Sequence, residues 1–185
     1  KLCYTLEKRG FTESEIEILN HHPRLGYKYL SSTYNINSLS KLIVLQHHER
    51  PDGLGFPDRL TDENIIDLSK IVSIADAYDN LSTDLPGKRA MFPSDVLEYL
   101  MSNAGTMFDY NLISVFCRII IPFPKGTVVR LSTEEIARVE ETIPNFPLRP
   151  ILRIISGPRE SRIGNKISLL EELSIVITEI VYDVE

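Results

Sequence analysis

All four histidines of this 185-residue chain occur as two adjacent pairs, His21-His22 and His47-His48, an arrangement that scattered surface histidines would not produce. An acid, Asp76, follows His47 by 29 residues, and His22 precedes His47 by 25. Imidazole nitrogens with a carboxylate oxygen suit iron, manganese, zinc, cobalt or nickel, and suit calcium poorly. We therefore expect His22, His47, His48 and Asp76 to converge on a metal site.

The spacing of the second pair leaves the number of metal ions open. Adjacent residues of an α-helix point about 100° apart. His47 and His48 therefore reach one ion only if the helix unwinds at this point, and two ions if it does not. Unwinding is feasible because Arg50, the residue before Pro51, avoids the helical conformation. Taken singly, each histidine could be structural, but together with Asp76 they favour a metal site, and paired metal ions support phosphodiester hydrolysis.

Helices are expected to carry these ligands to one place. Thr12 and Glu15 fit a capping box, which predicts a helix over residues 13–20. The residue before a proline avoids the helical region, so His22-Pro23 should interrupt the helical path. A second helix is expected over residues 24–32.

The other predicted helices follow from apolar periodicity. One, capped by Ser38, ends at His47-His48. Another, over residues 68–82 and capped by Asp67, should carry Asp76 on its buried side. The apolar residues of that side are Leu68, Ile71, Val72 and Ala75. Two further helices are expected, one beginning at Pro93, with Met101 among its apolar residues and Gly105 at its end, and one capped by Asp109.

The sequence pattern changes from helical to strand-like at the proline-rich segment 122–126. The segments after it that are rich in β-branched residues are predicted to be strands, namely residues 127–131, 136–140, 151–155 and 175–181. The sequence therefore predicts a mainly α protein, with a helical bundle over residues 1–121 and a small β-rich appendage over residues 122–185.

Composition limits the possible partners and the compartment. With 43% hydrophobic and 25% charged residues, the chain has an ordinary globular composition. The net charge of -6 argues against binding of a DNA or RNA polymer. No apolar run reaches the roughly 18 residues that a membrane span requires. Cys3 and Cys117 are far apart, which indicates free thiols in a reducing compartment and predicts a cytoplasmic location.

The motifs around the histidines resemble one family. His-His-Glu-x-x-Asp-Gly-x-Gly-Phe-Pro spans residues 47–57 (the signature segment), with His-Pro-x-x-Gly at 22–26 and Ile-Ala-Asp-Ala-Tyr-Asp-Asn-Leu at 74–81. Over residues 8–121 the chain is similar to the HD-GYP family, bacterial phosphodiesterases that hydrolyse cyclic di-GMP to pGpG, GMP or both. The resemblance implies an HD-type helical bundle that holds two or three divalent metal ions, most commonly iron or manganese.

The resemblance also assigns roles to residues. The metal ligands that it implies are His22, His47, His48 and Asp76. The substrate-binding residues that it implies are Arg50, Asp52, Gly53 and Lys88. Glu49 and Gly55 belong to the signature segment without a separate role. The His-Asp dyad and its lysine are expected upstream of residue 1, so no catalytic residue beyond the metal ligands is visible in this chain.

Two departures from the family pattern bear on function. Phe56 stands in place of the usual tyrosine, and Leu85 stands in place of an arginine that binds phosphate, whose guanidinium is hard to replace. The leading prediction is a metal-dependent cyclic di-GMP phosphodiesterase. The alternatives are a degenerate module that binds cyclic di-GMP or a protein without turnover, and an HD-type hydrolase of another phosphate ester. An upstream sensory or receiver domain, protein partners and a homodimer are compatible with the leading prediction.

Overall fold

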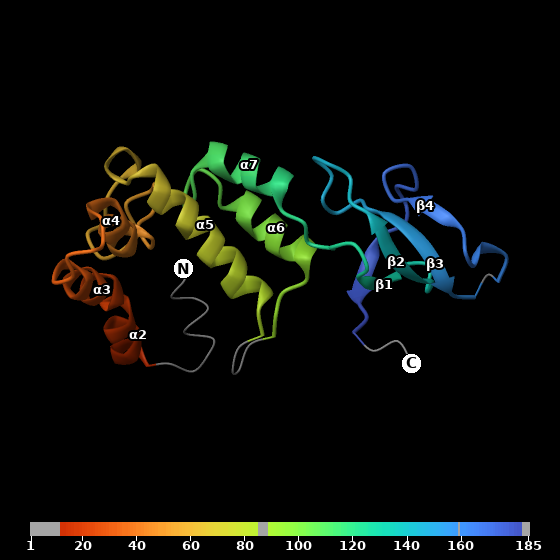
Figure 1. Cartoon of the computed structure of the whole chain (residues 1–185), viewed down its shortest axis with the longest axis horizontal. Helices are drawn as coiled ribbons and strands as arrows, with labels where there is room; N and C mark the ends of the chain where they lie inside the picture. The colour runs from red at the N-terminus through yellow and green to blue at the C-terminus, as the bar shows by residue number, and fades with distance from the viewer. Residues whose placement is uncertain (1–11, 85–88, 159, 183–185) are drawn as a thin grey trace. The chain divides into compact units, whose positions relative to one another are not determined.

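The computed structural model describes residues 12–84, 89–158 and 160–182. The chain divides into two compact units, Lys1–Ser114 and Val115–Glu185 (Figure 1). The described part of the first unit is helical, and that of the second contains an antiparallel sheet. The predicted fold class, a mainly helical protein followed by a small β region, is therefore confirmed. Leu85, Lys88 and Cys3 lie outside the described residues.

The helices follow one another along the chain, and the last of them crosses the boundary between the two units. Among the described residues they are α2 (Glu13–Asn20), α3 (His22–Ser31), α4 (Ser38–Gln46), η1 (Asp62–Asn64), α5 (Asp67–Ser82), α6 (Pro93–Ser102) and α7 (Tyr110–Ile119). Helix α3 packs on α4, α4 on α5, and α5 on α6 (Figure 1). None of the helices in these described ranges is long and apolar enough to cross a membrane.

Helices α2 and α3 meet at His21. The predicted capping box is present, because the Thr12 side chain accepts from the Glu15 N–H and the Glu15 carboxylate accepts from the Thr12 N–H. The predicted break between the two helices is present but lies one residue earlier, at His21, so that His22 itself is helical. His21 keeps a helical conformation, with φ -81° and ψ -11°, and Pro23 lies in the first turn of α3, where a missing N–H costs no hydrogen bond. His22 therefore lies in the first turn of a helix.

Helix α4 ends immediately before the second histidine pair. Its cap is Asn37 rather than the predicted Ser38, and the Asn37 side chain accepts from the Ser40 N–H at 2.8 Å. The last helical residue is Gln46, and His47 is the C-cap. The helix has thus ended before both histidines, which is the condition under which they can serve one ion.

Helix α5 buries a different side from the one predicted. Ile66, not Asp67, occupies the cap position, and no side-chain hydrogen bond caps the helix. The predicted apolar side is exposed, because Leu68, Ile71 and Val72 are 42%, 47% and 37% accessible. The buried residues are instead Ser69, Ser73, Ile74, Ala77 and Leu81. Small residues at i, i+4 spacing allow close packing against neighbouring elements, which an apolar pattern alone does not reveal.

Helices α6 and α7 lie close to their predicted positions. In α6 the apolar residues Val96, Leu97 and Leu100 are buried, but Met101, which was expected with them, is 61% exposed. The carboxylate of Asp109 accepts from the Leu112 N–H at 2.9 Å, so the predicted cap of α7 is confirmed.

The second unit contains a five-stranded sheet. Its strands are β1 (Val128–Leu131), β2 (Ile136–Glu141), β3 (Ile151–Ser156), β4 (Lys166–Ser168) and β5 (Ile177–Ile180). The order is β4-β3-β2-β1-β5, and every neighbouring pair is antiparallel. Four of these strands were predicted, whereas β4 was missed because three residues are too few to show an alternating pattern. Alternation buries one face, formed by Val129, Leu131, Ala137, Val139, Leu152 and Ile154.

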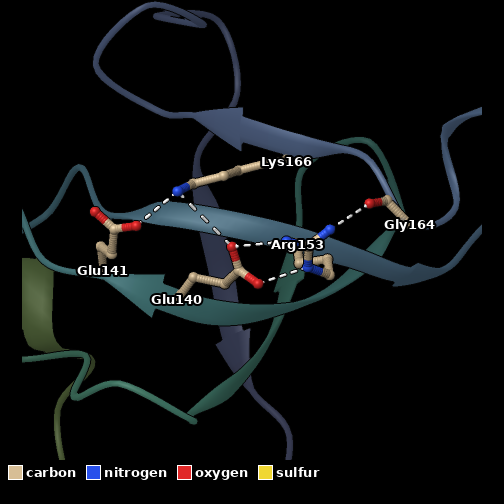
Figure 2. Close-up of polar contacts among 5 residues, drawn as sticks. All are labelled: Glu140, Glu141, Arg153, Gly164 and Lys166. Atoms are coloured by element: carbon tan, nitrogen blue, oxygen red, sulfur yellow. Dashed lines mark hydrogen bonds and ion pairs between the residues drawn. The ribbon is translucent and has the colours of Figure 1, made fainter.

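Charged side chains tie the strands together on the surface (Figure 2). Arg153 on β3 donates to both carboxylate oxygens of Glu140 on β2, at 2.5 Å and 3.1 Å, and to the Gly164 carbonyl oxygen at 2.8 Å. Lys166 on β4 donates to Glu141 at 2.6 Å. Opposite charges on neighbouring strands favour one pairing register. These contacts therefore help to fix β4 at the edge of the sheet.

Candidate metal centre and adjoining cavity

Three histidines converge where α3 begins and α4 ends. One ring nitrogen from each of His22, His47 and His48 lies within 4.8 Å of the others. The ring centroids of His47 and His48 are 4.0 Å apart, and that of His22 is 5.3 Å from His47 and 4.9 Å from His48. The predicted convergence of these three residues is thus present, from positions 25 residues apart in the chain.

A glycine allows the two helices to approach closely enough for this. Gly26 in α3 faces Val44 in α4, and a Cβ atom added to Gly26 would lie 2.8 Å from the Val44 Cγ1 atom. Carbon atoms do not approach that closely, so with any larger residue the Val44 side chain or the helices themselves would have to move. Because the histidines are contributed by both helices, this contact also sets their separation.

Backbone carbonyl groups fix the orientation of two of the rings. The Nδ1 atom of His22 lies 2.6 Å from the Leu19 oxygen, and that of His47 lies 2.9 Å from the Val44 oxygen. Because a carbonyl oxygen only accepts, each Nδ1 carries the hydrogen, and the Nε2 of each neutral ring bears a lone pair. These two Nε2 atoms face each other at 3.3 Å. Two lone pairs at that distance repel unless a proton or a metal ion joins them.

The protonation of the buried rings favours a metal ion. Burial lowers the pKa of His47, although the hydrogen bond to the Val44 carbonyl opposes this effect. Burial, together with the charges of His47 and His22, lowers the pKa of His48 to about 3. His48 is therefore neutral at physiological pH, and neutral imidazole is the form that binds metal ions.

Asp76 on α5 lies beside the histidines, outside their 4.8 Å cluster. Burial raises its pKa, while the charge of His47 and a hydrogen bond from Asn80 lower it by less. The Asn80 amide donates to Oδ1 at 2.9 Å, which orients the carboxylate. Sequence reasoning assigned no role to Asn80, which follows Asp76 by four residues, the spacing of side chains that meet on a helix.

Among the expected metal ligands, two buried polar atoms have no hydrogen-bond partner within the described part of the chain. They are Asp76 Oδ2 and His48 Nδ1. Buried polar atoms nearly always have partners, so each such case requires an explanation. A divalent metal ion would satisfy both atoms, since imidazole nitrogens with a carboxylate oxygen suit iron, manganese, zinc, cobalt or nickel. The donor set therefore fits a metal ion.

The signature segment folds back over the residues that carry the ligands. A Cβ atom at Gly55 would lie 2.5 Å from the Arg50 nitrogen and 2.6 Å from both Glu49 Cα and His48 O. The Phe56 N–H donates to the His48 oxygen at 3.1 Å, and the Phe56 ring centroid is 4.7 Å from that of His48. Gly55 is thus required by close backbone contact, and Phe56 covers one side of His48.

Glu49 holds the chain that follows the signature segment. Its side chain is buried, with 2% exposed. One carboxylate oxygen accepts from the Asp58 N–H at 2.6 Å and the other from the Leu60 N–H at 2.9 Å. Sequence reasoning missed this role, because an acid next to two histidines looks equally like a metal ligand.

Replacing Glu49 by glutamine should loosen this loop. The amide would direct its NH2 group at one of the two backbone N–H donors and leave that donor without an acceptor, at a cost of about 1–3 kcal/mol. We expect Glu49→Gln to lower the free energy of unfolding by that amount, measured by urea denaturation. Glu63→Gln, which changes an exposed glutamate of η1, is the control and should leave stability unchanged. Equal stability of the two variants would contradict the role of Glu49.

The predicted substrate-binding residues separate into two groups. Arg50 lines a cavity beside His48. Asp52 forms an ion pair with Arg50, accepts from the Leu54 N–H at 3.0 Å and donates its own N–H to the Thr106 oxygen. Gly53 has φ +72° and forms the turn. The described geometry thus gives Asp52 and Gly53 structural contacts, while Lys88 lies outside the described residues.

The cavity is large enough for a small ligand. Its volume is about 350 Å³, within the range of small-molecule sites. Arginine, aromatic and apolar side chains share its wall. They include His48, Arg50, Phe56, Arg59, Met107 and Phe108. No role was predicted for Arg59, because nothing in its local sequence marks it as part of a site.

Two family models match this chain. The HD domain family matches residues 3–112, and a family described as the KOW domain associated with HD domain matches residues 128–184. The chain is 39% identical over 114 residues to the cyclic di-GMP phosphodiesterase response regulator RpfG of Xanthomonas campestris pv. campestris, which covers 61% of this chain and 30% of the relative.

Two further relatives extend over more of the chain. The cyclic di-GMP phosphodiesterase PdeB of Borreliella burgdorferi is 32% identical over 144 residues, covering 76% of this chain and 38% of PdeB. The cyclic di-GMP phosphodiesterase PA4108 of Pseudomonas aeruginosa is 28% identical over 155 residues, covering 83% of this chain and 37% of PA4108. The chain spans about a third of the length of these relatives.

This chain belongs to the HD domain family, as the resemblance of its signature segment to the HD-GYP proteins predicts.

Proposed function

We propose that this chain forms part of a metal-dependent phosphodiesterase that hydrolyses cyclic di-GMP to pGpG, GMP or both. The observation that carries the proposal is the pair of facing Nε2 atoms of His22 and His47, 3.3 Å apart, with both Nδ1 atoms committed to carbonyl oxygens. The names of three relatives that share this part of the chain support the choice of substrate.

The metal would be held by the histidines and the carboxylate. We assign His22, His47, His48 and Asp76 as ligands of two or three divalent ions, iron or manganese, with further ligands expected upstream of residue 1. Metal ions of this kind supply a nucleophile from water at neutral pH and neutralise charge on a phosphate. The chain itself contributes neutral imidazoles in a fixed orientation and a carboxylate held by Asn80.

The cavity would hold the substrate. Arg50 lies in its wall, and its guanidinium group can bind phosphate oxygens while Asp52 keeps it in place. Phe56, Met107 and Phe108 provide an apolar wall suited to a purine base. Lys88 is proposed to bind phosphate as well. A cytoplasmic location, an upstream sensory or receiver domain, protein partners and a homodimer remain predictions of the sequence.

The direct test combines metal analysis with turnover. The full-length protein is purified without oxygen, loaded with Fe(II) or Mn(II), and assayed with cyclic di-GMP, with products separated by chromatography. Bound metal together with formation of pGpG or GMP is the expected result. Bound metal and tight dinucleotide binding without products would favour a degenerate binding module instead. Turnover of other phosphate esters but not of cyclic di-GMP would identify an HD-type hydrolase with a different substrate. Absence of bound metal would overturn the proposal.

A further inference from the structure

Arg59 contributes to the wall of the cavity from a loop whose backbone is unusual. Its φ is +55°, in the left-handed region that residues other than glycine rarely adopt, because Cβ then lies close to the following carbonyl oxygen. Non-glycine residues in such conformations persist where the surroundings enforce them, and they gather at functional sites. The arginine at this position is therefore tolerated at a cost in stability.

The surroundings of Arg59 enforce this conformation. The backbone N–H groups on both sides of it, those of Asp58 and Leu60, donate to the two oxygens of the buried Glu49 carboxylate. Glu49 is in turn the residue after His48. The same short stretch of chain thus supplies a histidine of the cluster and fixes the loop that carries Arg59.

The charges around Arg59 leave its guanidinium group available. Arg50 in the same cavity is paired with Asp52, and the neighbouring Asp58 is paired with Arg24. Within the part of the chain that the structure describes, Arg59 forms no ion pair. The cavity wall beside His48 therefore contains one arginine whose charge is balanced by Asp52 and one, Arg59, whose charge is not balanced by an ion pair. This excess of positive charge favours an anionic ligand.

We propose that Arg59 is a specificity-determining residue that binds a phosphate oxygen of the cyclic dinucleotide in this cavity. A planar guanidinium group binds phosphate through two parallel hydrogen bonds, a geometry that lysine cannot reproduce. Arg50 and Arg59, both in the wall of one cavity of about 350 Å³, match a ligand that carries two phosphodiester groups. The inference rests on the proposed function, because it takes its ligand from it.

The test exploits the backbone of Arg59. Arg59→Gly removes the guanidinium group and also relieves the left-handed strain, so the variant should unfold at an equal or higher temperature than wild type. Its affinity for cyclic di-GMP, measured by calorimetry on chain freed of metal by a chelator, should fall about 10- to 100-fold, the loss of a charged hydrogen bond. In the metal-loaded chain, KM should rise with little change in kcat.

Two variants and one control complete the design. Arg59→Asn also accepts the left-handed conformation and should lose affinity as Arg59→Gly does. Arg59→Lys should recover part of the affinity, because the charge returns without the planar fork. Arg138→Gln, which removes an exposed arginine of β2, should bind like wild type. Equal binding by wild type and Arg59→Gly overturns the role of Arg59 alone, whereas absence of dinucleotide binding and turnover in wild type overturns the proposed function as well.

Discussion

His48→Ala is expected to remove most of the metal from the chain and to abolish hydrolysis of cyclic di-GMP. The His48 ring is buried and neutral, and its Nδ1 atom has no hydrogen-bond partner within the described residues. Loss of a group that merely supports a ligand commonly costs 10- to 100-fold in metal affinity, so loss of a ligand should cost at least about 100-fold. Titration of the purified chain with a competing chelator measures this affinity directly.

Two further variants define the boundary of the metal site. Asp76→Ala should also weaken metal binding, because the buried Oδ2 atom is lost. His21→Ala is the matched control, since His21 is exposed, directly precedes His22 and lies outside the histidine cluster. Its metal content should equal that of wild type. Metal affinity that is unchanged in both His48→Ala and Asp76→Ala would refute their assignment as ligands.

Gly55→Ala should be the most disruptive change that adds only one methyl group. The added Cβ atom would meet the Arg50 nitrogen at 2.5 Å, and the Glu49 Cα and His48 oxygen at 2.6 Å each. All three are backbone atoms that cannot rotate away, so the signature segment must separate from the ligand-bearing chain. We expect a loss of about 3 kcal/mol in the free energy of unfolding, at the upper end of overpacking effects. Metal affinity should fall as well, because His48 is displaced.

Gly105→Ala separates steric overlap from backbone conformation. Gly105 has φ +80°, and a Cβ atom there would meet nothing within 4 Å. The alanine variant should therefore lose only about 1–2 kcal/mol, the cost of the left-handed conformation, and should keep its metal affinity. Urea denaturation and chelator titration of both variants provide the comparison. If Gly55→Ala were no less stable than Gly105→Ala, the close contact would have no energetic importance.

Local signals in the sequence predicted much of the helical fold. The Thr12 capping box and the Asp109 cap are present because these hydrogen bonds are made within four residues of chain. The break predicted at His22 lies at His21 instead, because a proline in the first turn suits a helix. The prediction of the buried side of α5 was wrong because that side combines Ser69 and Ser73 with apolar residues, so hydrophobicity alone did not mark it.

The candidate site was predictable only in part. His22, His47 and His48 were predicted from the two adjacent histidine pairs, because residue types and their spacing can be read directly from the sequence. The sequence could not reveal that Glu49 holds the loop through Asp58 and Leu60, because those contacts depend on the path of the backbone. Arg59 was missed for the same reason, as its place in the cavity follows from that path.

The carbonyl groups that hold the two imidazoles have a consequence for how this site can change over time. Leu19 and Val44 each stand three residues before the histidine that they orient, and each acts through its backbone oxygen. Every residue has such an oxygen, so mutation of either side chain leaves the orienting contact in place. A metal-binding side chain is usually oriented by a second side chain, and both residues must then be conserved together. Here the helical geometry supplies the contact, so this part of the metal site can persist while the sequence around it drifts.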